Sequence, residues 1–166
     1  MIITLIGMPG SGKSCMGRAV APKVKMKNVD ADAVIEKRYG RKLQEIINAD
    51  GLERFKQIEE EVLISLNTDN TIISTGGSAV YYKRAMEHLR GIGKVVYLKV
   101  DLDVLIERLG DFSKRGIAMK PGQTIEDLYN ERCALYEKYA DKTINCSGNA
   151  YSKYHNQLVD YIKSLK

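Results

Sequence analysis

The chain has 166 residues, 44% of them hydrophobic, which is enough apolar material to bury the core of one domain. Its net charge of +5 favours anionic ligands, but acidic and basic residues alternate along the chain, so we expect no nucleic-acid surface. Three scattered cysteines and two histidines indicate neither a disulfide framework nor a zinc site.

The first predicted element is a buried strand over residues 1–6. It leads into GMPGSGKS, residues 7–14, which matches the pattern GxxxxGK[ST], and then into a predicted helix over residues 13–24. In such a loop the backbone N–H groups face phosphate oxygens, the lysine neutralises the outer phosphates and the hydroxyl binds Mg²⁺. The alternative is an ordinary glycine-rich turn. We expect a nucleoside triphosphate to contact Gly10, Ser11, Gly12, Lys13, Ser14 and Cys15, the last of these as a small buried residue.

A second strand is predicted over residues 26–29, and it ends in Asp30 and Asp32. Open α/β sheets place their ligand sites at the carboxyl ends of strands. Two carboxylates opposite a phosphate-binding loop therefore indicate a functional site. The alternative is that they cap the next predicted helix, residues 33–39.

A short helix near residues 43–47 and a longer one from Leu52 come next. In the longer helix the apolar residues recur at helical spacing, and we place Glu59 with its neighbouring glutamates on the solvent side.

The third strand, residues 71–74, runs into Gly76 and Gly77. Adjacent glycines either allow close approach of a ligand or form only a tight turn.

Strands and helices continue to alternate to the end of the chain. We predict helices over 81–90, 102–109, 124–139 and 151–165, and strands over 94–100 and 142–146. This alternation predicts an α/β fold with a parallel sheet and helices on both faces. Residues 110–122 break the pattern, as either a lid that carries Arg115 or a surface loop.

The expected location is the cytoplasm. Met1 leads directly into an apolar strand without a basic leader, and no apolar run approaches the ~18 residues that span a bilayer. Widely spaced cysteines fit reduced thiols. We therefore expect no membrane partner.

Several motifs then follow in one order along nearly the whole chain: GMPGSGKS, VDAD, GLERFKQIE, STGGSAV, ERLGDFSKRG and ERCALYEKYAD. Together they resemble the shikimate kinase family. The resemblance implies a three-layer P-loop NTPase with a five-stranded parallel sheet, in a single domain over residues 1–166. It also implies a small substrate-binding region near residues 31–61 and a lid near 110–122. We expect the protein to be a monomer. The implied reaction transfers the γ-phosphoryl group of ATP, with Mg²⁺, to a hydroxyl of shikimate, in aromatic amino-acid biosynthesis.

The resemblance assigns roles to the phosphate-binding loop and to the acidic pair. Lys13 would hold the β- and γ-phosphates, and Ser14 would bind Mg²⁺. Asp30 would orient the metal through water, while Asp32 would bind the acceptor hydroxyls and assist deprotonation. Phosphoryl transfer needs chiefly positioning and charge neutralisation, so this set is chemically sufficient.

Three arginines gain roles from the same resemblance. Arg115 matches the catalytic arginine of the lid, and Arg108 matches the arginine that packs on adenine. Arg132 matches the arginine that binds the acceptor carboxylate. Asp32, Gly76 and Gly77 complete the expected acceptor site together with Lys56.

Four positions depart from the family pattern. Lys56 stands where the FRxxE motif has arginine, and lysine lacks the planar fork that grips a carboxylate. Ser78 replaces the third glycine of a run, so a side chain projects where the family leaves bare backbone. Gly116 and Ala134 replace prolines. Since Lys56 and Ser78 lie in the expected acceptor pocket, the nucleotide is better defined than the acceptor.

Two other functions therefore stay open. The chain is either a P-loop kinase for another hydroxy acid, a sugar acid or a nucleotide, or a nucleotide-binding regulatory protein without catalysis. The second is disfavoured because Lys13, Asp30, Asp32 and Arg115 are all present.

Overall fold

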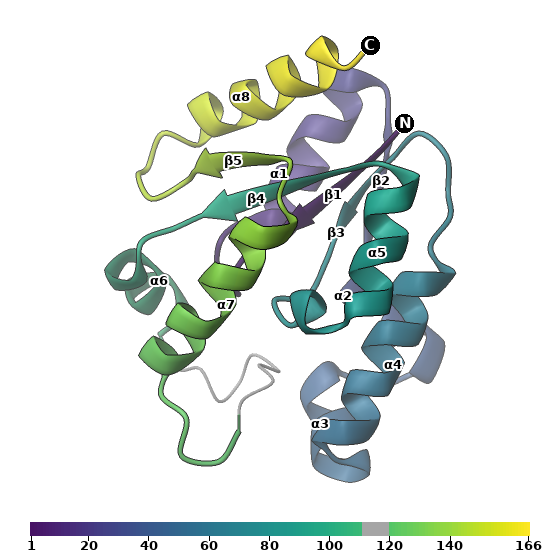
Figure 1. The fold of residues 1–166 in the computed structure, drawn as a ribbon, viewed down its shortest axis with the longest axis vertical. Coiled ribbons are helices and arrows are strands. Elements are labelled where there is room, and N and C mark those ends of the chain that lie inside the picture. Colours follow the sequence, from purple (N-terminus) through teal and green to yellow (C-terminus); the bar gives the residue numbers. More distant parts are fainter. Residues whose placement is uncertain (111–119) are drawn as a thin grey trace.

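The computed structural model describes residues 1–110 and 120–166. Its centre is a parallel sheet in the order β2-β3-β1-β4-β5 (Figure 1). The strands are β1 Ile2–Ile6, β2 Lys27–Asp30, β3 Thr71–Ser74, β4 Lys94–Lys99 and β5 Lys142–Asn145. This confirms the predicted α/β fold and its five-stranded parallel sheet.

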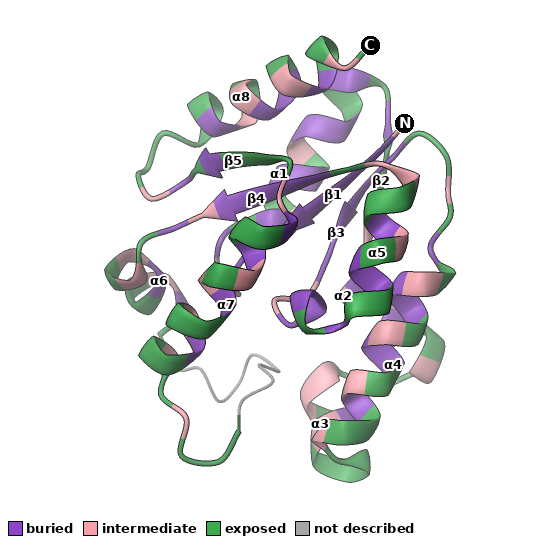
Figure 2. Ribbon diagram, in the orientation of Figure 1, coloured by how far each residue is buried: buried purple, intermediate pink, exposed green. Residues whose placement is uncertain are grey.

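The central strands β1 and β3 are buried along their whole length (Figure 2). Their sequences, IITLI and TIIS, are short β-branched runs, as expected for strands covered on both faces. Pairing of Ile2 with Thr71 and of Leu5 with Ser74 brings the loops after both strands to one edge of the sheet. That edge carries the candidate site.

Eight α-helices flank the sheet over the described residues. They are α1 Lys13–Val20, α2 Ala31–Tyr39, α3 Leu43–Asp50, α4 Leu52–Ser65, α5 Lys83–Ile92, α6 Leu102–Leu109, α7 Ile125–Tyr139 and α8 Tyr151–Ser164. Two 3₁₀ turns, η1 Ala21–Val24 and η2 Ala79–Tyr81, accompany them. Helices α5 and α7 cover the near face of the sheet in Figure 1, and α1 packs against β3 and α8.

Two helix boundaries differ from the sequence-based prediction for identifiable reasons. The first helix ends at Val20 because Pro22 has no backbone N–H with which to continue the α-helical ladder, so η1 follows. The second helix begins at Ala31, two residues early. Asp30 caps it by accepting hydrogen bonds from the backbone N–H groups of Asp32 and Ala33.

Helices α2, α3 and α4 enclose a small hydrophobic cluster of their own. It consists of Ile35, Ile46, Phe55, Ile58 and Val62. Figure 1 shows α3 and the start of α4 extending beyond the sheet edge. This group of helices forms one wall of the candidate site.

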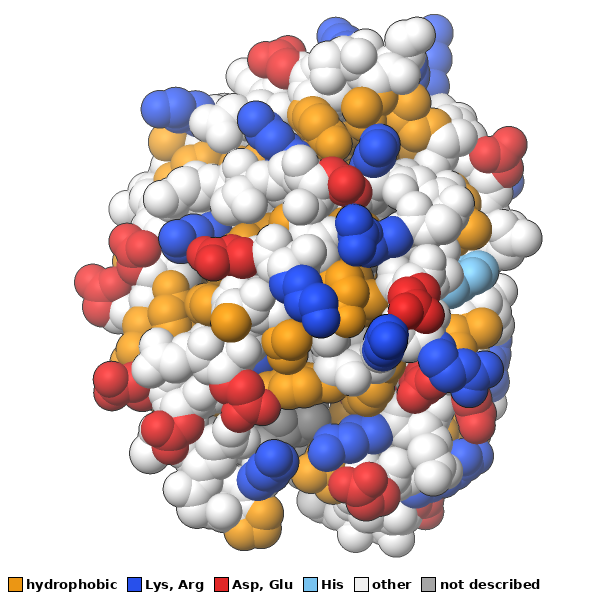
Figure 3. Space-filling model, in the orientation of Figure 1, with side chains coloured by type: hydrophobic (Ala, Val, Ile, Leu, Met, Phe, Trp, Pro, Cys, Tyr) orange, Lys and Arg blue, Asp and Glu red, His pale blue; other side chains and the backbone are white. Residues whose placement is uncertain are grey.

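The visible surface carries no patch of a single charge. On the face in Figure 3, lysine and arginine side chains lie among aspartate and glutamate side chains. Over the described part of the chain, no helix has the length and apolar character needed to cross a membrane.

Candidate active site

The phosphate-binding loop joins β1 to α1. Gly7, Gly10 and Gly12 all have positive φ angles, of 152°, 82° and 91°, which favour glycine. A Cβ on Gly7 would also lie 2.7 Å from the carbonyl oxygen of Leu98. Helix α1 has no acidic residue in its first turn and no side-chain cap. Its N-terminal N–H groups are therefore available to bind an anion, because no side chain of the helix start occupies them.

Lys13 lies at the start of α1 and is buried, with 8% of its surface exposed. Its ammonium group donates hydrogen bonds to the carbonyl oxygens of Gly7, at 2.7 Å, and Met8, at 2.9 Å. Burial lowers the pKa of Lys13 to about 8, although the charge of Asp32 opposes this shift. An anionic ligand would stabilise the charged form of a lysine that is buried in this way.

Asp30 contacts the phosphate-binding helix directly. Its Oδ1 caps α2, so the alternative role of helix cap is real for this residue. Its Oδ2 accepts a hydrogen bond from Ser14 Oγ at 2.5 Å. The carboxylate of Asp30 thus caps a helix and also contacts Ser14, the other side chain that was predicted to bind metal.

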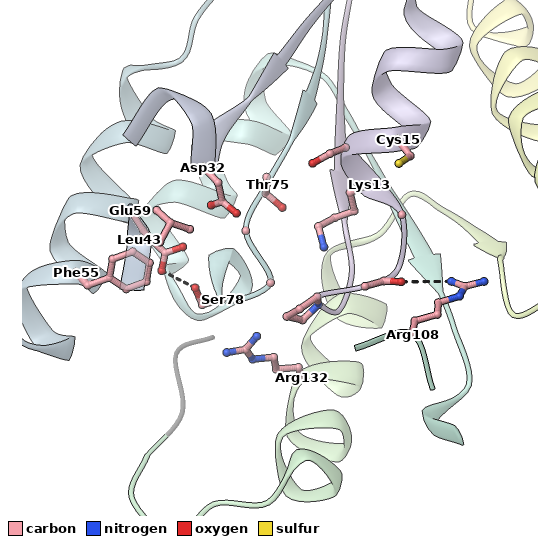
Figure 4. A pocket seen from close by; sticks show the side chains of 16 residues that line it. Lys13, Cys15, Asp32, Leu43, Phe55, Glu59, Thr75, Ser78, Arg108 and Arg132 are labelled. Atoms are coloured by element: carbon pink, nitrogen blue, oxygen red, sulfur yellow. Dashed lines mark hydrogen bonds between the residues drawn. The ribbon is translucent and has the colours of Figure 1, made fainter. Parts of the chain in front are cut away.

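Asp32 lies in the first turn of α2 and faces the cavity shown in Figure 4. Burial, followed by the negative charges of Glu59 and Asp30, raises the pKa of Asp32 to about 7. A carboxylate with a raised proton affinity suits a group that accepts a proton from an alcohol.

Glu59 was predicted on the solvent side of α4, and that prediction is wrong. Only 4% of its surface is exposed, and it lines the same cavity as Asp32. Burial raises the pKa of Glu59, while hydrogen bonds from Ser78 and Tyr82 partly offset this effect. The glutamate run at residues 59–61 resembles a solvated face. The one signal that could have found Glu59 is its match, in FKQIE, to the glutamate of the family's FRxxE pattern, which the sequence analysis used only for Lys56.

The cavity has a volume of about 580 Å³ and opens between the phosphate-binding loop, α2, α4 and α7 (Figure 4). It brings together most of the predicted site. The predicted residues that line it are Gly10, Gly12, Lys13, Ser14, Cys15, Asp32, Gly76, Gly77, Arg108 and Arg132. Ser78, expected in the acceptor pocket as a departure from the family pattern, also lines it. Residues that line it without having been assigned to the site are Pro9, Leu43, Phe55, Glu59 and Thr75.

Two predicted residues lie differently from expectation, and a third is not described by the structure. Ser11 is buried within the loop, where its Oγ lies 3.5 Å from Lys13 Nζ, and it does not line the cavity. Cys15 is exposed rather than buried, and its sulfur lies 3.6 Å from an Arg18 guanidinium nitrogen. Arg115 and most of the predicted lid lie outside the described residues.

The turn after β3 leaves its backbone bare toward the cavity. A Cβ on Gly77 would lie 2.7 Å from Pro9 Cδ and 2.8 Å from Arg132 Nη1. The carbonyl oxygen of Gly77 accepts a hydrogen bond from Tyr136 at 2.6 Å. Ser78 lines the cavity, but its hydroxyl is directed to Glu59.

The two cations expected at the acceptor lie in different places. Arg132, on α7, is 1% exposed and lines the main cavity, with its guanidinium 5.4 Å from the centre of the Tyr81 ring. Lys56 instead lines a neighbouring cavity of about 390 Å³ and pairs with Glu53 at 3.5 Å. The two cavities share Ser78 in their walls.

Arg108 joins the phosphate-binding loop to the loop that follows β5. Its guanidinium donates hydrogen bonds to the carbonyl oxygens of Gly10, Cys146 and Gly148. It also lies 5.9 Å from the centre of the exposed Tyr151 ring. Arg108 therefore borders the end of the cavity next to the phosphate-binding loop.

The family model described as shikimate kinase matches residues 9–163. A shikimate kinase of Clostridium botulinum strain 657 is 34% identical over 168 residues, covering 99% of this chain and 95% of the relative. One from Haemophilus influenzae strain PittEE is 35% identical over 167 residues, covering 98% and 93%.

Two solved structures have the same fold. Shikimate kinase from Acinetobacter baumannii in complex with shikimate superposes with a TM-score of 0.88 at 28% identity, covering 99% of this chain and 94% of that one. Shikimate kinase from Aquifex aeolicus gives a TM-score of 0.85 at 28% identity, covering 99% and 98%.

Proposed function

The chain belongs to the shikimate kinase family, and from this premise we propose that it transfers the γ-phosphoryl group of ATP to a hydroxyl group of shikimate. The observation that carries the proposal is the convergence of Lys13, Asp32 and Arg132 on one cavity. A phosphate-binding cation, a proton acceptor and a carboxylate-binding cation are what this reaction requires.

The nucleotide would bind with its phosphates against the N-terminus of α1. Backbone N–H groups there and the Lys13 ammonium face the same space, so both stabilise negative charge on the phosphates. Their positions are set before the nucleotide arrives, because glycines shape the loop and two carbonyl oxygens hold Lys13.

The side chains of Ser14 and Asp30 fit a Mg²⁺ ion. Both offer oxygen atoms, they are already in contact, and magnesium is commonly held by one or two protein oxygens together with substrate phosphates. When bound, the ion supplies further neutralisation of phosphate charge. The described residues include no cluster of three or more His, Cys, Asp or Glu side chains that could hold a metal.

The acceptor would lie between Asp32 and Arg132. Asp32 would accept hydrogen bonds from the acceptor hydroxyls and take the proton of the attacking one. Arg132 would bind the acceptor carboxylate, and Gly76 and Gly77 would allow the ring to approach the backbone. Lys56 and Arg115 remain proposals that rest on the family resemblance, with Arg115 acting on the transferred group.

The test is ADP release with Mg²⁺ and ATP. Shikimate is compared with quinate, gluconate, homoserine and nucleoside monophosphates, and a reaction without acceptor serves as control. Shikimate-dependent turnover well above all other acceptors is the expected result. Preference for another acceptor would show that Lys56 and Ser78 have changed the specificity, and ATP binding without any turnover would favour the regulatory protein.

We further propose a cytoplasmic monomer that acts on small molecules without nucleic acid or membrane. The three cysteines Cys15, Cys133 and Cys146 are free thiols, which fits a reducing compartment. Light scattering after gel filtration tests the monomer, for which a mass of 18.6 kDa is expected.

A further inference from the structure

Two hydroxyl groups converge on one carboxylate oxygen beside the cavity. Ser78 Oγ and Tyr82 Oη donate hydrogen bonds to Glu59 Oε1 at 2.5 Å and 2.6 Å. All three residues are buried, with exposed fractions between 4% and 7%. Figure 4 shows the Ser78 bond directed away from the centre of the cavity.

The other oxygen of Glu59 is directed toward the acceptor space. Glu59 Oε2 lies 2.8 Å from the position that a Cβ on Gly76 would occupy, and Asp32 Oδ1 lies 2.9 Å from the same position. Because a buried carboxylate is costly without hydrogen bonds, the two hydroxyls stabilise an anion in contact with the acceptor site.

Arg132 is the group that a displaced Glu59 would attract. Its Nη1 lies 2.8 Å from the position of a Cβ on Gly77, one residue before Ser78. Burial raises the pKa of Glu59, and after the two hydroxyl groups the positive charge of Arg132 opposes that rise, as expected for opposite charges on the two sides of the turn. A carboxylate deprived of its hydroxyl donors would compete with the acceptor carboxylate for this guanidinium.

We propose that Ser78 and Tyr82 are positioning residues for the acceptor, because their hydroxyls hold the Glu59 carboxylate in place and so keep Arg132 directed into the cavity. Neither hydroxyl needs to touch the acceptor. The inference rests on the proposed function, since it assigns the acceptor carboxylate to Arg132. It also explains how a serine is accommodated in the Gly76–Gly77–Ser78 turn.

The test compares Ser78→Ala, Tyr82→Phe and the double variant with matched controls that lose a hydroxyl elsewhere. Ser65→Ala removes a hydroxyl that bonds within α4, and Tyr97→Phe removes a buried one that bonds to Cys133. Each single test variant should raise the KM for shikimate by about 3- to 10-fold, with the KM for ATP changed less than about twofold. The controls should leave both KM values near those of the native protein.

A second arm asks whether the effect passes through Glu59. In a Glu59→Gln background the neutral amide attracts Arg132 less, so Tyr82→Phe should raise the shikimate KM by a smaller factor than in the native background. An equal factor in both backgrounds, or equal rises in the KM for ATP and for shikimate, would overturn the inference. If Ser78→Ala does not fold, Tyr82→Phe and its control decide.

A readout independent of turnover separates this inference from the proposed function. The side-chain Nε–H resonance of Arg132, assigned with Arg132→Lys, should shift or broaden in Ser78→Ala and Tyr82→Phe but not in Ser65→Ala or Tyr97→Phe. If the native protein does not phosphorylate shikimate, the proposed function fails and this resonance alone decides the positioning role. An unchanged resonance together with unchanged KM values would refute it.

Discussion

Asp32 and Glu59 direct their carboxylates to the same point beside Gly76, from helices α2 and α4. A side chain at Gly76 would contact both oxygens, at 2.9 Å and 2.8 Å. The two negative charges repel each other, so Glu59 increases the proton affinity of Asp32. The glycine keeps open the space in which an acceptor hydroxyl would meet Asp32.

Replacing Asp32 with asparagine should remove the proton acceptor and leave the nucleotide site intact. We expect kcat to fall by about 10²- to 10⁴-fold with little change in the KM for ATP. Steady-state kinetics with shikimate measures both values. Asp69→Asn, at an exposed residue far from the cavity, is the control. Full activity in Asp32→Asn would exclude its role and favour a non-catalytic function.

Replacing Lys13 with methionine keeps the length of the side chain and removes its charge. Without the cation at the phosphates, kcat should fall by at least about 10²-fold. Circular dichroism should show an unchanged fold, since methionine is more easily buried than an ammonium group. The exposed Lys83, changed to methionine, should keep full activity. Comparable activity in the two variants would contradict the role of Lys13.

Glu59→Gln should alter the pH dependence of stability. Because burial raises the pKa of Glu59 in the folded protein, its contribution to stability is full below pH 4.5 and is lost as pH rises through the raised pKa. Glutamine does not titrate and its oxygen still accepts the two hydrogen bonds. The melting temperature of Glu59→Gln relative to the native protein should therefore be higher at pH 8 than at pH 5.

The control for this measurement is Glu45→Gln, at an exposed position of α3. Its difference from the native protein should be similar at both pH values. A difference for Glu59→Gln that stays level or shrinks toward pH 8 would show that the ionised carboxylate is not penalised in the fold.

Gly77→Ala places a methyl group against Pro9 and Arg132, at 2.7 Å and 2.8 Å. Since Pro9 is a rigid ring and Arg132 would have to leave its position in the acceptor cavity, we expect the KM for shikimate to rise by at least about tenfold. Gly91→Ala, in α5, meets no atom within 4 Å and should instead stabilise the protein by about 0.5–1 kcal/mol. Kinetics and thermal unfolding of the two variants check this contrast.

Lys56→Ala tests whether a residue of the second cavity serves the acceptor. If Lys56 binds the acceptor carboxylate, the KM for shikimate should rise by about tenfold while the KM for ATP stays near its original value. The ion pair with the exposed Glu53 is too weak for its loss to unfold the chain. An unchanged shikimate KM would remove Lys56 from the site.

The sequence predicted the fold and the phosphate-binding loop because both depend on local patterns. Strand runs such as IITLI and the spacing of Gly12, Lys13 and Ser14 can be recognised from a few adjacent residues. The burial of Glu59 depends instead on hydroxyls that lie 19 and 23 residues further along the chain. Periodicity in α4 could not reveal those partners.

Other site residues show the same limit. The direction of Lys56 toward the second cavity follows from the way α4, η2 and α7 surround that cavity, which no motif encodes. Arg108 was assigned from its neighbours in the sequence, yet its hydrogen-bond partners Gly10, Cys146 and Gly148 lie 98, 38 and 40 residues away. Side-chain direction is a property of the assembled fold.

The strand order also has a consequence for how the chain acquires activity. Asp30 is the last residue of β2 and Lys13 follows β1, but β3 lies between those two strands. The two residues are therefore held together only after residues near 71–74 have paired with both strands. Arg132 arrives later still, on α7, which follows β4 and α6. Such long-range parallel pairing is slow to form. Regain of enzyme activity during refolding should therefore lag behind helix formation, and a nascent chain should be inactive until α7 has emerged from the ribosome.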